Sequence, residues 1–356
     1  MKRITLSLAA AGLGLAAGAA SAETSVTLYG IADVSIRYVN TSDGQTGQDG
    51  SRIAMANGAI SNSRWGLRGS EDLGDGNRAF FRLEQGFNVQ NGIASDTSKT
   101  FNRLAYVGLD GGKIGALTLG LQNTVIQDLM ADYFDPLTVG NYAENSWLPA
   151  AMGRVRTNNA FRYSNTLGDL AVAAQWANGD KWSDRAAGQQ MGISLRYTVG
   201  QLGLGGAFQK TFGADDSDLR QQVWNLSASY QFESAKIFAG YFNGRDQTGW
   251  VNAVMGGTTT ANLDRKDNGY FAGVTWQATP RWAITGAAYY DQSKNVVVDG
   301  DKGKRYALVA VAEYSLSKRT QVYGTVDYNK VRDAVTGEIA GRTSQIGAGL
   351  GMRHIF

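Results

Sequence analysis

A strict two-residue alternation of apolar and polar side chains is the feature that most constrains this chain. In residues 224–232 the apolar members are Trp224, Leu226, Ala228, Tyr230 and Phe232, and the residues between them are polar. Successive side chains of a β-strand point to opposite faces, so this period predicts a strand with one apolar and one polar face. The pattern returns at residues 191–198 and 322–329. The chain is therefore predicted to be built from β-strands.

The connections between these strands alternate in length. Short turn signals lie near residues 73–76, 111–113, 165–168, 200–201, 233–234, 279–280 and 316–318. Between them lie long polar stretches near residues 40–60, 89–100, 124–156, 178–189, 212–221, 245–267, 293–304 and 332–342. Transmembrane barrels have short turns at one end and long loops at the other. Seven turns and eight loops join sixteen strands, which predicts an all-β fold, a 16-stranded antiparallel transmembrane β-barrel.

Hydropathy is compatible with such a barrel. The mean hydropathy of the 356 residues is -0.26, and after residue 22 no apolar run approaches the ~18 residues that a spanning helix needs. A barrel pairs its backbone groups between strands and alternates lipid-facing with lumen-facing residues, which keeps average hydropathy modest. A large soluble β protein is the alternative. Charges near mid-strand on the polar faces, such as Arg82, Glu84, Arg196 and Asp327, count against it.

The N-terminus carries the pattern of an export signal. Lys2 and Arg3 precede an apolar stretch, residues 4–20, which closes on the small residues of positions 20–22. We expect cleavage after Ala22, which leaves residues 23–356 as a single barrel domain and lowers the formal charge from +3 to +1. Such a balance gives no sign of a nucleic-acid partner. Cysteine is absent, so no disulfide or thiolate metal site can form, and we expect no cofactor.

The last strand ends the chain on an aromatic residue. Residues 342–356 alternate through Ile346, Ala348, Leu350 and Met352, and the final residue is Phe356. A carboxyl-terminal aromatic residue on a strand resembles the signal that the outer-membrane barrel assembly machinery reads. We therefore interpret Phe356 as an assembly signal.

Several stretches resemble the general porins of Gram-negative bacteria, particularly the beta-proteobacterial and neisserial branch. They are residues 26–30 (VTLYG), 63–76 (SRWGLRGSEDLGDG), 102–109 (NRLAYVGL) and 351–356 (GMRHIF). The resemblance implies a homotrimer in the outer membrane, in contact with membrane lipid and lipopolysaccharide. It also implies a third outer loop folded into each lumen and passive diffusion of ions and small hydrophilic solutes.

In related porins, wall arginines face acidic residues of the inward loop. The matching wall positions here are Arg64, Arg103 and Arg154, with Arg37, Arg68, Arg82 and Arg156 as further candidates and Glu84 as a lumen carboxylate. The candidate loop, about residues 123–153, supplies Asp128, Asp132, Asp135 and Glu144. It lacks the PEFGG stretch of enteric porins, so for each acid an ordinary solvated charge, or a ligand of cations that bridge lipopolysaccharide, stays open. Arginine suits a narrow pore because it remains charged. We expect a mild anion preference.

Two other functions are compatible with an outer-membrane barrel. An outer-membrane enzyme would need a general base, and the one histidine, His354, lies three residues from the end of the last strand, where packing is the simpler role. A substrate-specific channel would need dedicated ligands or an aromatic path, to which Tyr289 and Tyr323 could contribute. The predicted lining is mainly charged and small polar, which favours a general diffusion channel over both alternatives.

Overall fold

The computed structural model describes residues 25–42, 49–137, 153–179, 181–255, 263–339 and 341–356. The expected signal peptide lies outside this part. The strands are β1 Ser25–Ser42, β2 Asp49–Asn57, β3 Arg64–Gly74, β4 Asn77–Gly86, β5 Leu104–Asp110, β6 Ala116–Asn123, β7 Arg156–Leu167, β8 Leu170–Ala177, β9 Gln190–Val199, β10 Leu202–Phe212, β11 Arg220–Gln231, β12 Ala235–Asp246, β13 Arg265–Gln277, β14 Trp282–Lys294, β15 Lys302–Ser315, β16 Thr320–Asp333 and β17 Ser344–Ile355. The short helices are η1 Gly112–Ile114, α1 Val125–Leu129, the π-helix η2 Met130–Phe134, α3 Trp250–Met255 and η4 Thr336–Glu338.

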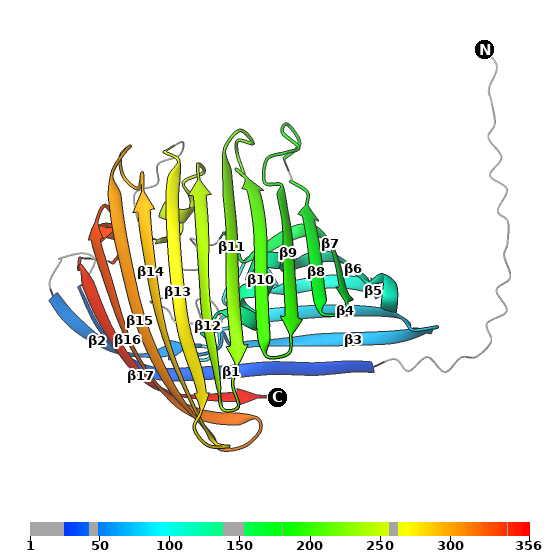
Figure 1. The fold of residues 1–356 in the computed structure, drawn as a ribbon, viewed down its shortest axis with the longest axis horizontal. Helices are drawn as coiled ribbons and strands as arrows, with labels where there is room; N and C mark the ends of the chain where they lie inside the picture. Colours follow the sequence, from blue (N-terminus) through cyan, green and yellow to red (C-terminus); the bar gives the residue numbers. More distant parts are fainter. Residues whose placement is uncertain (1–24, 43–48, 138–152, 180, 256–262, 340) are drawn as a thin grey trace, which may run out of the picture.

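One antiparallel sheet contains all of these strands and closes on itself (Figure 1). Strand β1 pairs with β17 on one edge, and on its other edge it pairs with β3 through residues 25–31 and with β2 through residues 34–42. Strands β2 and β3 are therefore two halves of one barrel strand, interrupted at residues 58–63. The barrel has sixteen strand positions, which confirms the prediction from turns and loops.

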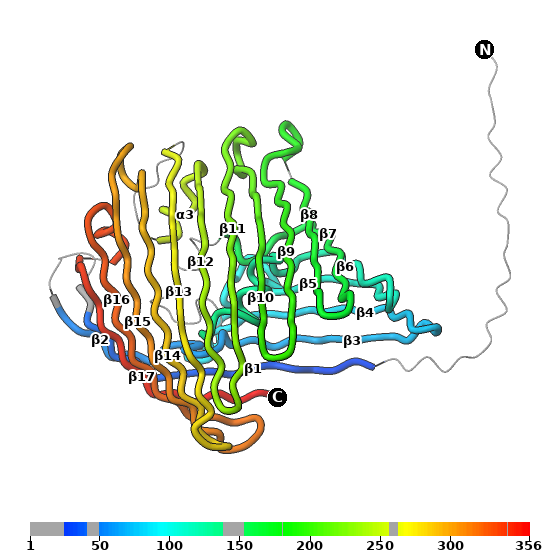
Figure 2. Tube along the Cα trace, in the orientation of Figure 1, coloured from blue at the N-terminus to red at the C-terminus, as the bar shows by residue number. Residues whose placement is uncertain are grey.

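The seven short turns lie at one end of the barrel and the longer connections at the other (Figure 2). In the turn between β3 and β4, Gly74, Asp75 and Gly76 all have positive φ, a conformation that glycine adopts without steric cost. The prediction of a long loop over residues 40–60 is wrong in part, because this stretch contains β2. No helix of the described residues is long and apolar enough to cross a membrane.

The barrel exposes apolar side chains on its outer face and buries polar side chains on its inner face, which is the opposite of the arrangement in soluble proteins. On β11 the apolar Leu226 is 60% exposed on the outer face, whereas Asn225 on the inner face is 1% exposed. Water around the barrel would make this arrangement unfavourable, because burial of apolar area drives folding in water. A hydrocarbon environment on the outside and a polar lumen account for it. The alternative prediction, a large soluble β protein, is therefore wrong.

The interruption between β2 and β3 folds inward. Asp33 lies on the inner face of β1, and its carboxylate accepts the main-chain N–H groups of Ile60 at 3.2 Å and Ser61 at 2.7 Å. Ser63 adds a hydrogen bond from its hydroxyl to the Asp33 carbonyl. Residues 58–63 therefore lie over the lumen side of β1, where Ile60 joins an apolar cluster that also contains Tyr323.

The seam between the first and last strands is held by side chains that cross β17. Tyr323 of β16 donates its hydroxyl to Asp33, and Arg37 Nη2 lies 2.6 Å from Asp327 Oδ1. Both pairs join residues 290 positions apart. Glycines make room for the crossings: a Cβ at Gly351 would overlap the Tyr323 ring, and one at Gly347 would overlap the Arg37 guanidinium. The inner face of β17 is thus left open so that β1 can reach β16.

Phe356 completes this seam at the end where the short turns lie. Its backbone N–H donates to the Gly30 carbonyl at 3.0 Å, and its carbonyl accepts from the Gly30 N–H at 2.9 Å. Its ring covers Gly30 on the outer face and stacks on His354 at 6.4 Å. The terminal residue therefore contributes both backbone pairing and apolar contact to barrel closure.

We expect deletion of Phe356 to lower the amount of barrel inserted in the outer membrane and to raise degradation in the periplasm. The reason is the loss of two backbone hydrogen bonds at the seam together with the proposed assembly signal. Surface labelling and periplasmic fractionation measure the result, and Phe356→Tyr, which keeps both features, is the control. Unchanged surface levels after the deletion would show the residue to be incidental.

Candidate pore constriction

The third long connection begins as a short helical segment on the inner wall. Thr124 caps α1, its hydroxyl accepting the Gln127 N–H at 3.4 Å. The segment α1–η2 then packs against β8 to β12, with Val125, Met130 and Phe134 buried. The Met130 sulfur lies 2.9 Å from the side-chain nitrogen of Asn225, an inward-facing residue of β11. Residues 138–152 lie outside the described part, and Glu144 falls among them.

Glu84 is the common ion-pair partner of three arginines on the inner wall. It is 2% exposed, and its carboxylate lies 2.6 Å from Arg103 Nε, 3.3 Å from Arg82 Nη2 and 3.7 Å from Arg64 Nε. The Tyr29 hydroxyl donates to the same carboxylate at 2.9 Å. Because these side chains come from β1, β3, β4 and the end of the connection before β5, Glu84 fixes several neighbouring wall segments around one anionic centre.

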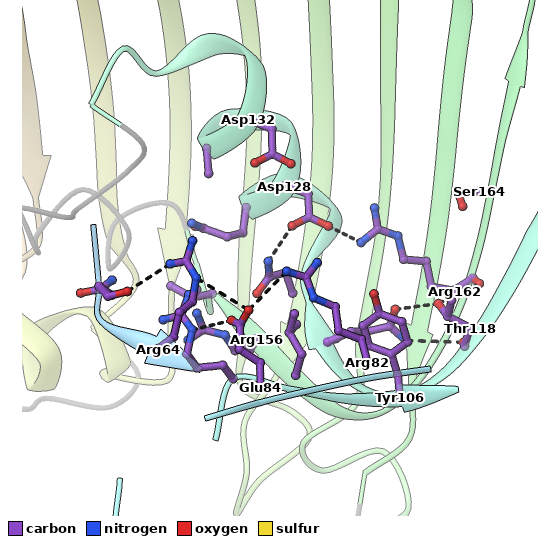
Figure 3. A pocket seen from close by; sticks show the side chains of 18 of the residues that line it. Arg64, Arg82, Glu84, Tyr106, Thr118, Asp128, Asp132, Arg156, Arg162 and Ser164 are labelled. Atoms are coloured by element: carbon purple, nitrogen blue, oxygen red, sulfur yellow. Dashed lines mark hydrogen bonds and ion pairs between the residues drawn. The ribbon is translucent and has the colours of Figure 1, made fainter. Parts of the chain in front are cut away.

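A cavity of about 610 Å³ separates this wall from the helical segment (Figure 3). Asp128 and Asp132 face it from the α1–η2 side, opposite Arg64, Arg82 and Arg156. Asp128 is held by an ion pair with Arg162 of β7 and by the side chain of Asn123 at 2.7 Å. The described lining contains six arginines, Arg64, Arg82, Arg103, Arg156, Arg162 and Arg353, and three carboxylates, Glu84, Asp128 and Asp132.

Arg64, Arg82 and Arg156 lie across the cavity from Asp128 and Asp132, and this separation of charge produces an electric field across the cavity. Low-dielectric walls focus such a field, so it acts strongly on permeating ions. Burial raises the pKa of Asp132 above its ordinary value, and the nearby Asp128 carboxylate raises it further, while Arg162, Arg82 and Arg64 oppose the shift. As the pH falls, Asp132 therefore loses its negative charge earlier than an ordinary aspartate would.

The other predicted site residues lie elsewhere. Arg37 is buried in its ion pair with Asp327 at the seam. Arg68 lies over the Tyr29 ring at 5.5 Å, in a smaller cavity nearer the short turns. Arg154 is partly buried near Asp246 and does not line the main cavity. Asp135 accepts the Tyr289 hydroxyl at 2.6 Å and packs against the wall.

Sequence reasoning did not single out Arg162 and Arg353. Arg162 shares the inner face of β7 with Ala160 and Ser164, so the two-residue alternation alone could have shown that it points into the lumen. Arg353 lies in the last strand and reaches the cavity while bonded to Ser61 of the inward segment at 2.8 Å. Its placement depends on residues 58–63, which no local pattern indicated.

A closed antiparallel barrel with an apolar exterior, and with arginines and carboxylates lining a cavity inside it, defines a transmembrane channel of the outer-membrane type. The family model described as "Gram-negative porin" matches residues 7–334. The chain belongs to this family, whose members are channels, and the protein is located in the outer membrane of a Gram-negative bacterium.

Individual relatives agree along the whole chain. An outer membrane porin protein of Bordetella pertussis is 31% identical, with 98% of this chain and 99% of the relative covered. Outer membrane porin protein 32 of Delftia acidovorans is 30% identical over 98% of this chain and 99% of its own length. Among solved structures, the anion-selective porin from Comamonas acidovorans superposes with a TM-score of 0.73 at 26% identity, covering 94% of this chain and 100% of its own.

Proposed function

We propose that this porin is a general diffusion channel with a mild preference for anions, passing ions and small hydrophilic solutes. The observation that carries the proposal is the excess of arginine around the main cavity, six against three carboxylates in the described lining. Fixed cations in a narrow aqueous passage raise the local concentration of anions. The name of the Comamonas relative, an anion-selective porin, supports the same direction.

The lining also favours general diffusion over substrate-specific transport. Tyr289 and Tyr323, which the sequence suggested as parts of an aromatic path, are 3% and 4% exposed. Their hydroxyls are bonded to Asp135 and Asp33. Both rings therefore serve to hold inner segments to the wall, and the exposed polar surface of the passage is mostly charged or small.

Planar-bilayer recording tests the proposal. We expect conductance to rise in proportion to salt concentration, without saturation, and the reversal potential in a salt gradient to show anion preference at low ionic strength. The preference should fade as salt rises, because the Debye length shrinks from about 10 Å at 0.1 M to about 3 Å at 1 M. Saturation with one solute would favour a substrate-specific channel, and cation preference at low salt would contradict the proposal.

The raised pKa of Asp132 leads to a dependence of selectivity on pH. As the pH falls from 7, Asp132 takes up its proton before an ordinary aspartate would, so the lining loses a negative charge and anion preference should increase. Reversal potentials measured from pH 7 to pH 4 check this. The variant Asp132→Asn should show the stronger preference already at pH 7, with a flatter response. An equally steep response in that variant would assign the change to another group.

We propose that the protein acts as a homotrimer in contact with outer-membrane lipid and lipopolysaccharide, after insertion by the barrel assembly machinery. The single barrel is already closed, so its geometry alone does not require partner chains. The trimer is therefore proposed from the resemblance to general porins. Electrophoresis in denaturing detergent without boiling should give a band near three times the monomer mass, which boiling converts to the monomer. A monomer as the sole species in mild detergent would contradict the trimer.

A further inference from the structure

The lipid-facing side of the barrel carries cations that lie directly opposite one another on five neighbouring strands. The opposed pairs are Arg245 with Lys266, Lys266 with Lys294, Lys294 with Lys302, and Lys304 with Arg332. Lys330 lies beside them, opposite Tyr306. We call these seven residues the outer cation row. It runs across the ends of β12 to β16 that lead into the long connections, at the upper left of Figure 2.

The alternation on each strand shows that the outer cation row points outward. On β15, Lys302 and Lys304 share the exposed face with Leu308, which is 54% exposed, whereas Gly303, Arg305 and Ala307 are buried. On β14, Lys294 is exposed and the adjacent Ser293 is buried. These cations are therefore on the lipid side of the barrel wall and not in the lumen.

A band of tyrosine rings lies immediately below the row. Tyr241, Tyr270, Tyr290 and Tyr306 are register partners on β12 to β15, with successive ring centroids 5.0, 6.3 and 4.9 Å apart. Such aromatic bands sit at the boundary between hydrocarbon and headgroups. Most of the cations lie two to four residues further along, about 7–14 Å at the usual strand rise. The row therefore lies at the level of the outer-leaflet headgroups.

Among the described residues, ion pairs neutralise only one end of the row. Asp264 lies 2.8 Å from Arg245 Nη2 and 3.8 Å from Lys266 Nζ. Within the described residues, no acid forms an ion pair with Lys294, Lys302, Lys304 or Arg332. Asp301, in the connection between β14 and β15, instead accepts the N–H groups of residues 296–298. Like charges directly opposite on a sheet are destabilising, so this arrangement is unfavourable unless an external anion lies between the cations.

We propose that the outer cation row binds the phosphate groups of the outer-leaflet glycolipid, lipopolysaccharide. The proposal identifies the surface that makes the membrane contact proposed above. A phosphate carries one to two negative charges and several acceptor oxygens, so one group placed between two opposed cations would relieve their repulsion. The acyl chains would then lie along the apolar outer face below the tyrosine band, where Leu308 and Val326 are exposed.

The test compares two sets of charge removals. The row variant combines Lys294→Gln, Lys302→Gln, Lys304→Gln and Arg332→Gln. The matched control removes four cations at the short turns: Lys113→Gln, Arg281→Gln, Lys318→Gln and Arg319→Gln. Each protein is purified as the full oligomer and placed in phosphatidylcholine nanodiscs with lipid A that carries both phosphates, or with its dephosphorylated form. Bound lipid A is counted by native mass spectrometry, and the unfolding temperature is measured with and without lipid A.

We expect the wild type to retain more of the phosphorylated lipid A than of the dephosphorylated form. The row variant should lose about tenfold or more of that preference, because each basic residue near an anionic surface usually contributes about 1 kcal/mol. Without lipid A the row variant should be at least as stable as the wild type, because repulsion is removed; with phosphorylated lipid A the wild type should be the more stable. Equal retention of both lipid forms by the wild type, or an equal loss in the control, would overturn the proposal. Conductance of the row variant separates this result from the proposed pore function, which predicts no change.

Discussion

Replacing Arg64, Arg103 and Arg156 together by serine is expected to abolish the anion preference of the channel. The three arginines line the main cavity, and their removal leaves three arginines and three carboxylates in the described lining. The fixed charge that attracts anions would then be balanced. Reversal potentials at about 0.1 M salt, where a Debye length of about 10 Å leaves the field largely unscreened, measure the change.

Arg154→Ser is the matched control for this experiment. The resemblance to general porins assigns Arg154 to the constriction wall, whereas the structure places it outside the cavity lining. We therefore expect the single variant to keep wild-type selectivity. The triple variant should still migrate as a folded barrel, because Glu84 keeps Arg82 and the Tyr29 hydroxyl as partners and lumen substitutions mainly alter selectivity. Wild-type selectivity in the folded triple variant would show that these arginines do not set the field.

Replacing Arg37 by methionine is expected to destabilise the barrel by about 3–5 kcal/mol, the usual cost of removing one partner from a buried ion pair. Asp327, whose side chain is 1% exposed, would be left without its guanidinium at the seam between β1 and β17. Urea titration in lipid vesicles, read out as the folded fraction on unboiled gels, gives the free energy of unfolding.

The double variant Arg37→Met/Asp327→Asn separates the ion pair from the packing of the long arginine side chain. Because the second change removes the uncompensated charge, it should restore a large part of the lost stability, and the double-mutant cycle gives the coupling energy. Equal stability of Arg37→Met and the wild type would mean that the pair contributes nothing to seam closure. A double variant as unstable as the single one would assign the effect to packing.

The fold could be predicted from the sequence because its signals are local. Each strand shows a two-residue period, and each end is defined by a turn or a polar stretch, so sixteen strands follow from counting. The misplaced segment is instructive: β2 has the sequence DGSRIAMAN, in which Ile53 and Met55 are the only large apolar residues. Polar and glycine residues around them gave it the composition of a loop. Its pairing with β1 outweighs that local preference.

The candidate site was predictable as a set of residue types and faces but not as a geometry. The resemblance to general porins assigned Arg64, Arg82 and Arg103 to the pore wall, and the structure brings them to Glu84. Whether Arg154 or Arg156 lines the cavity depends on where the chain rejoins the sheet after a long connection, and the structure begins β7 at Arg156. The register of β6 and β7 shifts near Gly120, which no sequence period indicates. The inward segment at residues 58–63 depends on contacts with Asp33 and Arg353 that are remote in sequence.

The two side-chain pairs that cross β17 also determine the register in which β1 pairs with β17. Neighbouring strands elsewhere in the barrel are joined by a turn or connection that limits how they can slide, but β1 and β17 have no such link. A slip by one residue would send every side chain to the wrong face. A slip by two residues keeps the apolar and polar faces intact, so hydrophobicity alone does not reject it. Such a slip would take Arg37 away from Asp327 and Asp33 away from Tyr323 simultaneously. The pairing of unlike polar groups therefore selects one alignment among those that the membrane would accept equally.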